Sequence, residues 1–218
     1  MVECEYKKPA CMNVLDERSN LTRREFLKVI GIGGSGLICC STMDLTLGMK
    51  KIFAESRYPY LTVVRGKNPA KITRCAIDAV GGMKKFVSRG DIVVVKPNMA
   101  WDRLPSQAAN TNPSVVETVA KMAFESGAKR VKVFDNPCNN ERRVHTNSGI
   151  AEACRNVGAD VSYIDKRKFK THTIHGENIK KWPVYTDILD ADKVINVPIA
   201  KHHSSAGLTM SMKNWFGG

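Results

Sequence analysis

The sequence contains seven cysteines but no C-x-x-C pair. Zinc ribbons and ferredoxin-type iron–sulfur clusters are held by closely spaced thiolates, so the missing pair argues against either group being held by this chain alone. Four of the cysteines lie within the first 40 residues. The other three, Cys75, Cys138 and Cys154, are enough for one disulfide and an unpaired thiol.

Acidic side chains are scarce, with 21 Asp and Glu against 34 Lys and Arg, which gives a formal net charge of +13. The basic excess persists beyond residue 54 and favours an anionic partner. Aromatic residues make up only 7% of the chain, and no stretch interleaves them with basic residues as single-strand binders do. Nucleic acid is therefore not the expected partner.

Apolar runs long enough to span a membrane are also missing. The segment 29–43 carries no charge but has only 15 residues, which is too short for a comfortable transmembrane helix. Residues 31–36 have the G-x-G-x-x-G spacing of a dinucleotide-binding turn, and such a turn must follow a buried strand. Residues 23–25, two arginines and a glutamate, occupy the position of that strand, so an export signal fits the segment better.

The stretch Thr22–Lys28 resembles the twin-arginine translocation signal, with Arg23 and Arg24 as the paired arginines. The resemblance implies that residues 1–55 form a signal segment and spacer, with cleavage between Ser41 and Ser56. It also implies that the twin-arginine translocase is a partner and that the chain meets the membrane only during export. The expected location is periplasmic or extracytoplasmic.

Residues 56–218 alternate short apolar runs with helical patterns and are expected to form one domain. The branched run Ile92–Val95 is typical of a strand buried on both faces of a parallel sheet. Asn112-Pro113 predicts the start of a helix, which Gly127 ends. Strands separated by helices indicate βαβ units, and we therefore expect an α/β fold with an open, mostly parallel sheet and flanking helices. Further strands are predicted at 61–64, 131–134, 160–164 and 194–197, and further helices from Asn68-Pro69 and over 148–157.

Polar residues follow three of the predicted strands, at the edge where ligands bind in an open α/β sheet. Lysines there would hold a phosphate or carboxylate, an asparagine would orient it, and an aspartate would hold a hydroxyl, a metal or a lysine. The alternative is that these residues merely end the strands, with their charges solvated or paired. The residues are Lys96 and Asn98, Asp135 and Cys138, and Lys201 with His202 and His203.

The adjacent histidines point in opposite directions if the chain is extended, so only one is expected to face the site. We choose His202, which with Asp135 would handle protons or a metal. The segment 207–217 is interpreted as a glycine turn that opens a short helix, and a helix N-terminus beside lysines is a natural anion site. Lys213 and Asn214 are therefore expected to belong to the same pocket.

A metal site is left open, with His172, His175 and Cys138 as candidate ligands. The spacing His172-x-x-His175, with Glu177 nearby, supplies the right ligand types. The segment looks extended, however, and its basic neighbours repel cations, so an ordinary loop is the other interpretation. Cys138 is either a ligand or a reactive thiol at the predicted edge.

Four sequence blocks together resemble the domain-of-unknown-function family 362: Lys96–Asn98, Thr111–Pro113, Ile195–Pro198 with Lys201 and His202, and Gly207–Gly217. The resemblance covers about residues 61–218 and implies an α/β fold. Some members carry ferredoxin-type iron–sulfur modules, so an association with such clusters is implied although this chain has no ligating cysteine pattern. The family domain continues beyond the last block, which implies that the chain is incomplete at its C-terminus.

Three functions follow from these patterns. The first is an exported enzyme or redox accessory protein that binds an anionic ligand or cofactor through Lys96, Lys201 and Lys213, with Asn98 and Asn214 orienting it. The second is a non-catalytic binding or maturation factor that uses the same pocket. The third is a basic surface that docks nucleic acid or anionic lipid.

Overall fold

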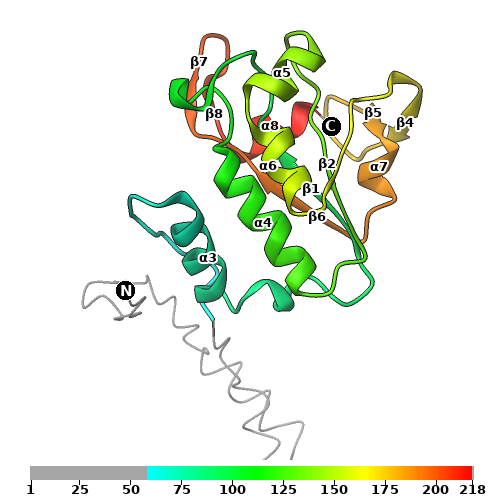
Figure 1. Cartoon of the computed structure of the whole chain (residues 1–218). Helices are drawn as coiled ribbons and strands as arrows, with labels where there is room; N and C mark the ends of the chain where they lie inside the picture. Colours follow the sequence, from blue (N-terminus) through cyan, green and yellow to red (C-terminus); the bar gives the residue numbers. More distant parts are fainter. Residues whose placement is uncertain (1–57, 218) are drawn as a thin grey trace, which may run out of the picture. The chain divides into compact units, whose positions relative to one another are not determined.

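The computed structural model describes residues 58–217 (Figure 1), which form one compact unit. The predicted signal segment, with Arg23 and Arg24, lies outside the described residues and stays a prediction. Within residues 58–217, no helix has the length and apolar character needed to cross a membrane.

A parallel sheet of four strands forms the centre of the fold and confirms the predicted α/β class. The strand order is β3-β2-β1-β6, and every neighbouring pair is parallel. The central strand β1 is buried along nearly its whole length, as its branched residues predict. The four strands are β1 (Ile92–Pro97), β2 (Arg130–Val133), β3 (Asp160–Val161) and β6 (Lys193–Val197).

Helices flank the sheet, and two of them begin where the asparagine-proline pairs predict. The side chains of Asn68 and Asn112 accept hydrogen bonds from the backbone N–H groups of the first turns of α3 and α4. Gly127 follows the end of α4 with a φ of +102°, which favours glycine. The helices are α3 (Pro69–Ala79), α4 (Pro113–Glu125), α5 (Glu141–Asn147), α6 (Ile150–Asn156), α7 (Thr186–Leu189) and α8 (Ser211–Asn214).

The core has two parts, because successive side chains of β1 point to opposite faces of the sheet. Val93 and Val95 pack with the apolar faces of α4 and α6. Val94 packs instead with Phe134 and Tyr185, whose rings meet edge to face at 5.0 Å between their centroids. The sheet is therefore covered on both sides.

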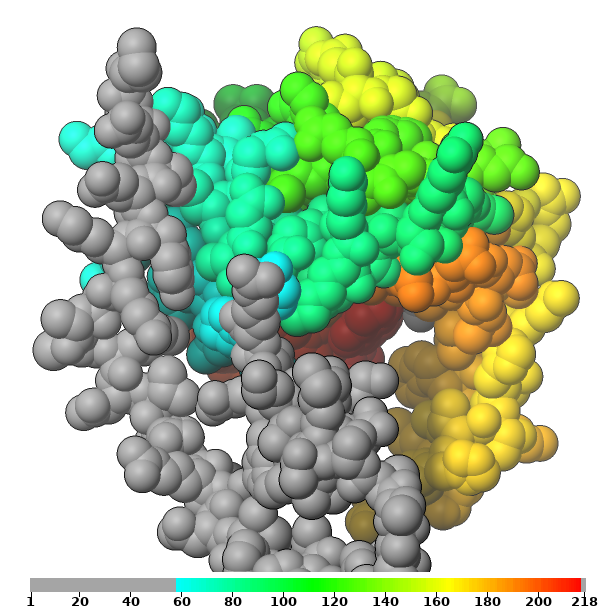
Figure 2. Space-filling model, turned by 90° about the horizontal axis from the view of Figure 1, so that it is seen from below, coloured from blue at the N-terminus to red at the C-terminus, as the bar shows by residue number. Residues whose placement is uncertain are grey.

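Two antiparallel hairpins add strands that the sequence pattern did not predict. The hairpin of β4 (Phe169–Thr173) and β5 (Lys181–Tyr185) lies along one edge of the described domain and is yellow and gold in Figure 2. The second hairpin joins β7 (Lys201–His203) to β8 (Gly207–Thr209). The strand at 194–197 is therefore not the last one, because the chain turns back at residues 204–206 and pairs β7 with β8.

One other predicted strand is missing, one is shorter than predicted, and one helix was not predicted. Residues 61–64 form no strand with any described residue, and Leu61 and Val63 are largely exposed. The strand predicted at 160–164 is regular over only two residues, and α5 was not predicted at all. An apolar run becomes a strand only where a partner edge is available, and a seven-residue helix such as α5 is too short for its periodicity to stand out.

Candidate functional site

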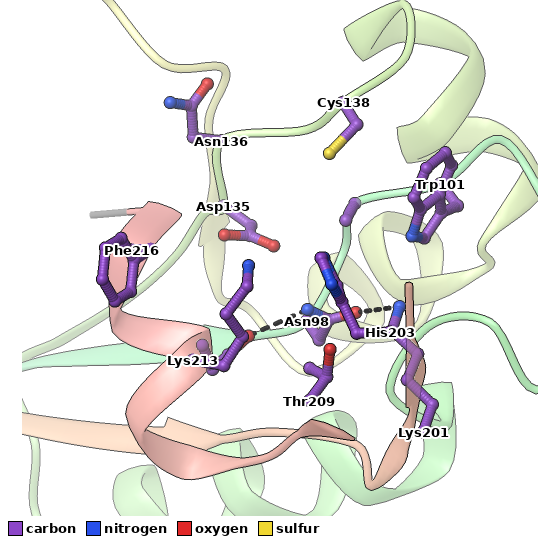
Figure 3. A pocket seen from close by; sticks show the side chains of 12 residues that line it. Asn98, Trp101, Asp135, Asn136, Cys138, Lys201, His203, Thr209, Lys213 and Phe216 are labelled. Atoms are coloured by element: carbon purple, nitrogen blue, oxygen red, sulfur yellow. Dashed lines mark hydrogen bonds between the residues drawn. The ribbon is translucent and has the colours of Figure 1, made fainter. Parts of the chain in front are cut away.

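An open cavity of about 160 Å³ lies at the carboxyl edge of the sheet (Figure 3). It is walled by the loop after β1, the loop after β2, the β7–β8 hairpin and the C-terminal turn that includes α8. These are the strand ends at which the polar residues were predicted to gather. The lining side chains include Asn98, Trp101, Asp135, Asn136, Cys138, Lys201, His203, Thr209, Lys213, Asn214 and Phe216.

Lys96 does not line the cavity, which corrects its predicted role as a ligand-binding residue. Its side chain is fully buried, and its Nζ lies 2.6 Å from Oδ1 of Asp135. The other oxygen of Asp135 accepts a hydrogen bond of 2.7 Å from the backbone N–H of Met99. Of the three partners predicted for Asp135, the structure therefore provides a lysine.

The ion pair places a carboxylate in the protein interior, and its ionisation reflects this position. Burial raises the pKa of Asp135, while the Lys96 ammonium and the backbone N–H groups of Met99 and Asn136 act in the opposite direction. Each charge of the pair compensates the other, so Asp135 contributes little net negative charge to the cavity.

A chain of side-chain hydrogen bonds joins the strand ends around the cavity. Lys201 Nζ donates to Oδ1 of Asn98 over 2.8 Å, and Asn98 Nδ2 donates to Oδ1 of Asn214 over 3.0 Å, as the dashed lines of Figure 3 show. Asn214 Nδ2 in turn donates to Asn196 Oδ1 over 2.8 Å. Lys201 also donates to the backbone carbonyl of Ala109. The network links the ends of β1 and β6 to β7 and α8.

Two lysines bring positive charge to the cavity from opposite sides. Figure 3 shows Lys213 extending from α8 toward the side of Asp135, while Lys201 approaches from β7. Partial burial lowers the pKa of Lys201, charges on Cys138 and Asp135 raise it, and the nearby Lys213 ammonium lowers it. Lys201 Nζ lies 6.0 Å from the ring centroid of Trp101, and Lys213 Nζ lies 5.7 Å from that of Phe216.

His203 rather than His202 lines the cavity, which corrects the choice between the two histidines. The alternation of side chains along β7 leaves His202 exposed. Nδ1 of His203 accepts hydrogen bonds from the backbone N–H groups of Ser205 (3.2 Å) and Ala206 (3.1 Å). The proton of the neutral ring is therefore assigned to Nε2, which remains available as a donor.

Thr209 is a cavity residue that the sequence reasoning missed. It is only 2% exposed, and its hydroxyl has no hydrogen-bond partner among the described residues. Figure 3 shows the hydroxyl oxygen directed toward the cavity. A buried hydroxyl normally finds a partner, so this one is a free donor for a bound molecule or a water. The segment 207–217 is expected to contribute to the pocket as a whole, but only the alternation of side chains along β8 shows that Thr209 faces inward.

The structure bears on two further expectations of ligand chemistry. Within residues 58–217, no group of three or more His, Cys, Asp or Glu side chains is arranged to hold a metal ion. His172 lies in β4 and His175 just after it, whereas Cys138 lies at the cavity. The anion site expected at a helix N-terminus stays a prediction, and α8 gives it little support, because a helix of four residues has only a small dipole.

A second cavity, of about 190 Å³, lies between α5, α6 and the segment after β3. Its floor includes His145, which is 3% exposed and whose two ring nitrogens have no hydrogen-bond partner among the described residues. The ring packs against Tyr163 at 4.5 Å between centroids. Burial lowers the pKa of His145 to about 4, and the charge of Arg155 acts in the same direction.

We expect His145 to make the fold sensitive to acid. The ring titrates near 6.5 in the unfolded chain and near 4 in the folded one, so between these values the unfolded state binds more protons and stability falls as the pH falls. The loss of unfolding free energy is expected to reach about 2–3 kcal/mol. His145→Phe should remove this component when urea unfolding at about pH 7 and about pH 4.5 is compared, whereas the exposed His202→Phe should not. Equal losses in His145→Phe and the parent protein would contradict the assignment.

The comparisons with known proteins bear on the same part of the chain. A family model described as a domain of unknown function (DUF362) matches residues 93–218, which include every lining residue of the first cavity. Thylakoid-associated protein sll1697 of Synechocystis sp. is 32% identical over 145 residues, which cover 66% of this chain and 44% of that protein. The chain thus spans less than half the length of this relative. No solved structure matches the chain.

Proposed function

Because the chain belongs to the DUF362 family, a domain of unknown function, we propose its function from the cavity alone: the cavity binds a small anionic ligand. The observation that carries this proposal is the charge around the cavity. Lys201 and Lys213 both line it, and the one carboxylate among the lining side chains, Asp135, is already paired with Lys96. A small cavity with two uncompensated ammonium groups favours an anion.

The neighbouring donors extend this preference from charge to hydrogen bonding. The hydroxyl of Thr209 and Nε2 of His203 are available in addition to the two ammonium groups. A tetrahedral or planar anion presents several acceptor oxygens, which is what such a set of donors needs. The volume of about 160 Å³ is below the usual range for drug-sized ligands, so a phosphate, a short carboxylate or the anionic end of a larger molecule fits best.

Binding is favoured over catalysis by the way Lys201 is held. Its ammonium donates to two oxygens, those of Asn98 and of the Ala109 backbone, which restrain it as a fixed charge. We therefore place ligand binding first and turnover second. The iron–sulfur association implied by the family resemblance has no observation in its favour within residues 58–217 and is not part of this proposal.

A basic docking surface is the weaker explanation of the positive charge. The densest basic run, residues 166–168, is partly compensated, because Arg167 pairs with Asp165 at 2.8 Å and Lys168 with Asp187 at 3.3 Å. The Arg167 pair is exposed and contributes little stability, whereas Asp187 is largely buried, and both pairs reduce the net charge that a polyanion would meet.

The proposal predicts that Lys213→Met weakens the binding of inorganic phosphate by about 10-fold or more, because a charge-assisted hydrogen bond is lost. Lys213 is chosen because it takes no part in the asparagine network, so its removal should leave the fold intact. Isothermal titration calorimetry at low ionic strength measures the affinity, with acetate as a second probe. Lys84→Met removes an equal charge from an exposed site away from the cavity and serves as the control. Equal effects of the two changes, or no binding of either anion, would reject the proposal.

A further inference from the structure

Cys138 is a free, exposed cysteine that lines the first cavity and has no part in the proposed anion binding. Figure 3 shows its sulfur directed toward the cavity, above Asp135 and His203. The second free cysteine, Cys154, differs in every respect that governs reactivity. It is fully buried, and burial with the nearby charge of Glu117 raises the pKa of its thiol to about 12.

The position of Cys138 is fixed by the backbone. Its N–H donates to the carbonyl oxygen of Ala100 over 2.9 Å, which ties the loop after β2 to the loop after β1. A second hydrogen bond joins the same two loops. The N–H of Asp102, two residues after Ala100, donates to Oδ1 of Asn139 over 3.0 Å. Two bonds in succession keep the thiol at the cavity mouth.

The charges around this thiol select what can reach it. A negative charge on Cys138 raises the pKa of Lys201, so the two side chains lie within electrostatic range of each other. Lys213 adds a second ammonium to the same cavity. A reagent that carries carboxylates is therefore concentrated beside the sulfur, and a cationic reagent is repelled.

An independent observation indicates that a ligand group belongs in the cavity that the thiol lines. Thr209 is 2% exposed, lines the same cavity and keeps an unpartnered hydroxyl directed into it. A carboxylate held between this hydroxyl and the lysines would satisfy the buried donor.

We propose that Cys138 is a modification site at which the cavity forms mixed disulfides with small carboxylate-bearing disulfides. The Cys138 thiolate attacks one sulfur of the reagent, a new sulfur–sulfur bond forms as the reagent's own bond breaks, and the second half leaves as a thiolate. The reagent is the oxidant, so no other reactant is needed. The inference rests on the positive charge that also supports the proposed anion binding, and the adduct would close the anion site.

The test compares two disulfides of similar size and opposite charge, dithiodiglycolate and cystamine. The full-length chain is incubated with each, and mass spectrometry of the peptide that contains Cys138 gives the two rates of adduct formation. The same chain unfolded in urea supplies the reference ratio, because Cys138 then keeps its sequence neighbours but loses the lysines of the cavity. We expect the folded chain to prefer dithiodiglycolate by about 10-fold or more relative to that reference.

Two further measurements tie the preference to the cavity. Salt at about 1 M shortens the screening length to about 3 Å and should remove most of the preference without any substitution. Lys213→Met should reduce it several-fold, whereas Lys84→Met should leave it unchanged. A ratio that is the same in folded and unfolded chains would overturn the inference.

Calorimetry with phosphate on the same sample separates this inference from the proposed function. Phosphate binding without a preference for dithiodiglycolate overturns the thiol site alone. A preference for dithiodiglycolate without phosphate binding overturns the proposed ligand but not the inference about Cys138.

Discussion

Lys96→Met is expected to lower the free energy of unfolding by about 3–5 kcal/mol, because it leaves an uncompensated charge inside the protein. Lys96 is 0% exposed, and its Nζ lies 2.6 Å from the carboxylate of Asp135, which is itself only 3% exposed. Methionine fills a similar volume, so the loss reports the missing charge rather than a cavity. Asp135 would keep the backbone N–H groups of Met99 and Asn136 as partners, which are too little to stabilise an isolated carboxylate.

Urea unfolding followed by circular dichroism measures this loss, and the size of the loss should depend on pH. Burial already raises the pKa of Asp135, and without Lys96 the carboxyl group is expected to take up a proton more readily still. The stability lost in Lys96→Met should therefore become smaller as the pH falls from about 7 to about 5, because the protonated Asp135 carboxyl leaves no unpaired charge in the interior.

A second substitution separates the buried charge from any packing defect. Lys96→Met combined with Asp135→Asn removes both charges and keeps an oxygen that can accept from Met99, so at least half of the lost stability should return. Lys84→Met, at an exposed site, is expected to change stability by less than about 0.5 kcal/mol. Lys96→Met within about 1 kcal/mol of the parent protein would show that the ion pair does not stabilise the fold.

The parts of the fold that could be predicted are those that local chemistry determines. The run Ile92–Val95 has no polar face, which predicts a strand buried on both sides. Asn112-Pro113 predicts a helix start, because the asparagine side chain can cap the helix and the proline ring fixes φ near the helical value. The β7–β8 hairpin could not be predicted in this way. Its strands have three residues each, and they pair because the chain after β6 turns back, which no local pattern encodes.

The candidate site was predictable in position more than in detail. Parallel strands present their carboxyl ends at one edge, and this rule brought Asn98 and Lys201 to one cavity. Lys213 was expected there for a different reason, the short helix after the glycine turn. Lys96 was misplaced because its partner, Asp135, lies 39 residues further along the chain, and the sequence does not show that their side chains face each other. The choice between His202 and His203 depended on the phase of a strand that had not been predicted.

Asn214→Leu is expected to lower the free energy of unfolding by about 2–4 kcal/mol, because several buried polar groups lose their partner at once. Asn214 is 3% exposed and accepts a hydrogen bond from Asn98. Its amide also donates to Oδ1 of Asn196 over 2.8 Å and to the backbone carbonyls of Lys96 and Pro97 over 3.3 Å each. Leucine has a similar size but can satisfy none of them.

The consequence should reach the cavity, because Asn214 attaches α8 to the ends of β1 and β6. With these bonds removed, α8 retains a single turn and no side-chain cap, so residues 210–217 should open locally and become sensitive to proteases. Lys213 belongs to this turn, and phosphate affinity should therefore fall together with stability.

Urea unfolding, limited proteolysis and phosphate calorimetry on the same preparation distinguish local opening from global destabilisation. Asn178→Leu, in the exposed turn between β4 and β5, introduces the same side chain without removing a hydrogen bond and should leave all three measurements unchanged. If Asn214→Leu weakens phosphate binding at a temperature where the rest of the fold remains intact, the asparagine network positions the site. If stability falls while cleavage at the C-terminal turn and phosphate affinity stay as in the parent protein, the network serves the fold alone, and Lys213 is held by other contacts.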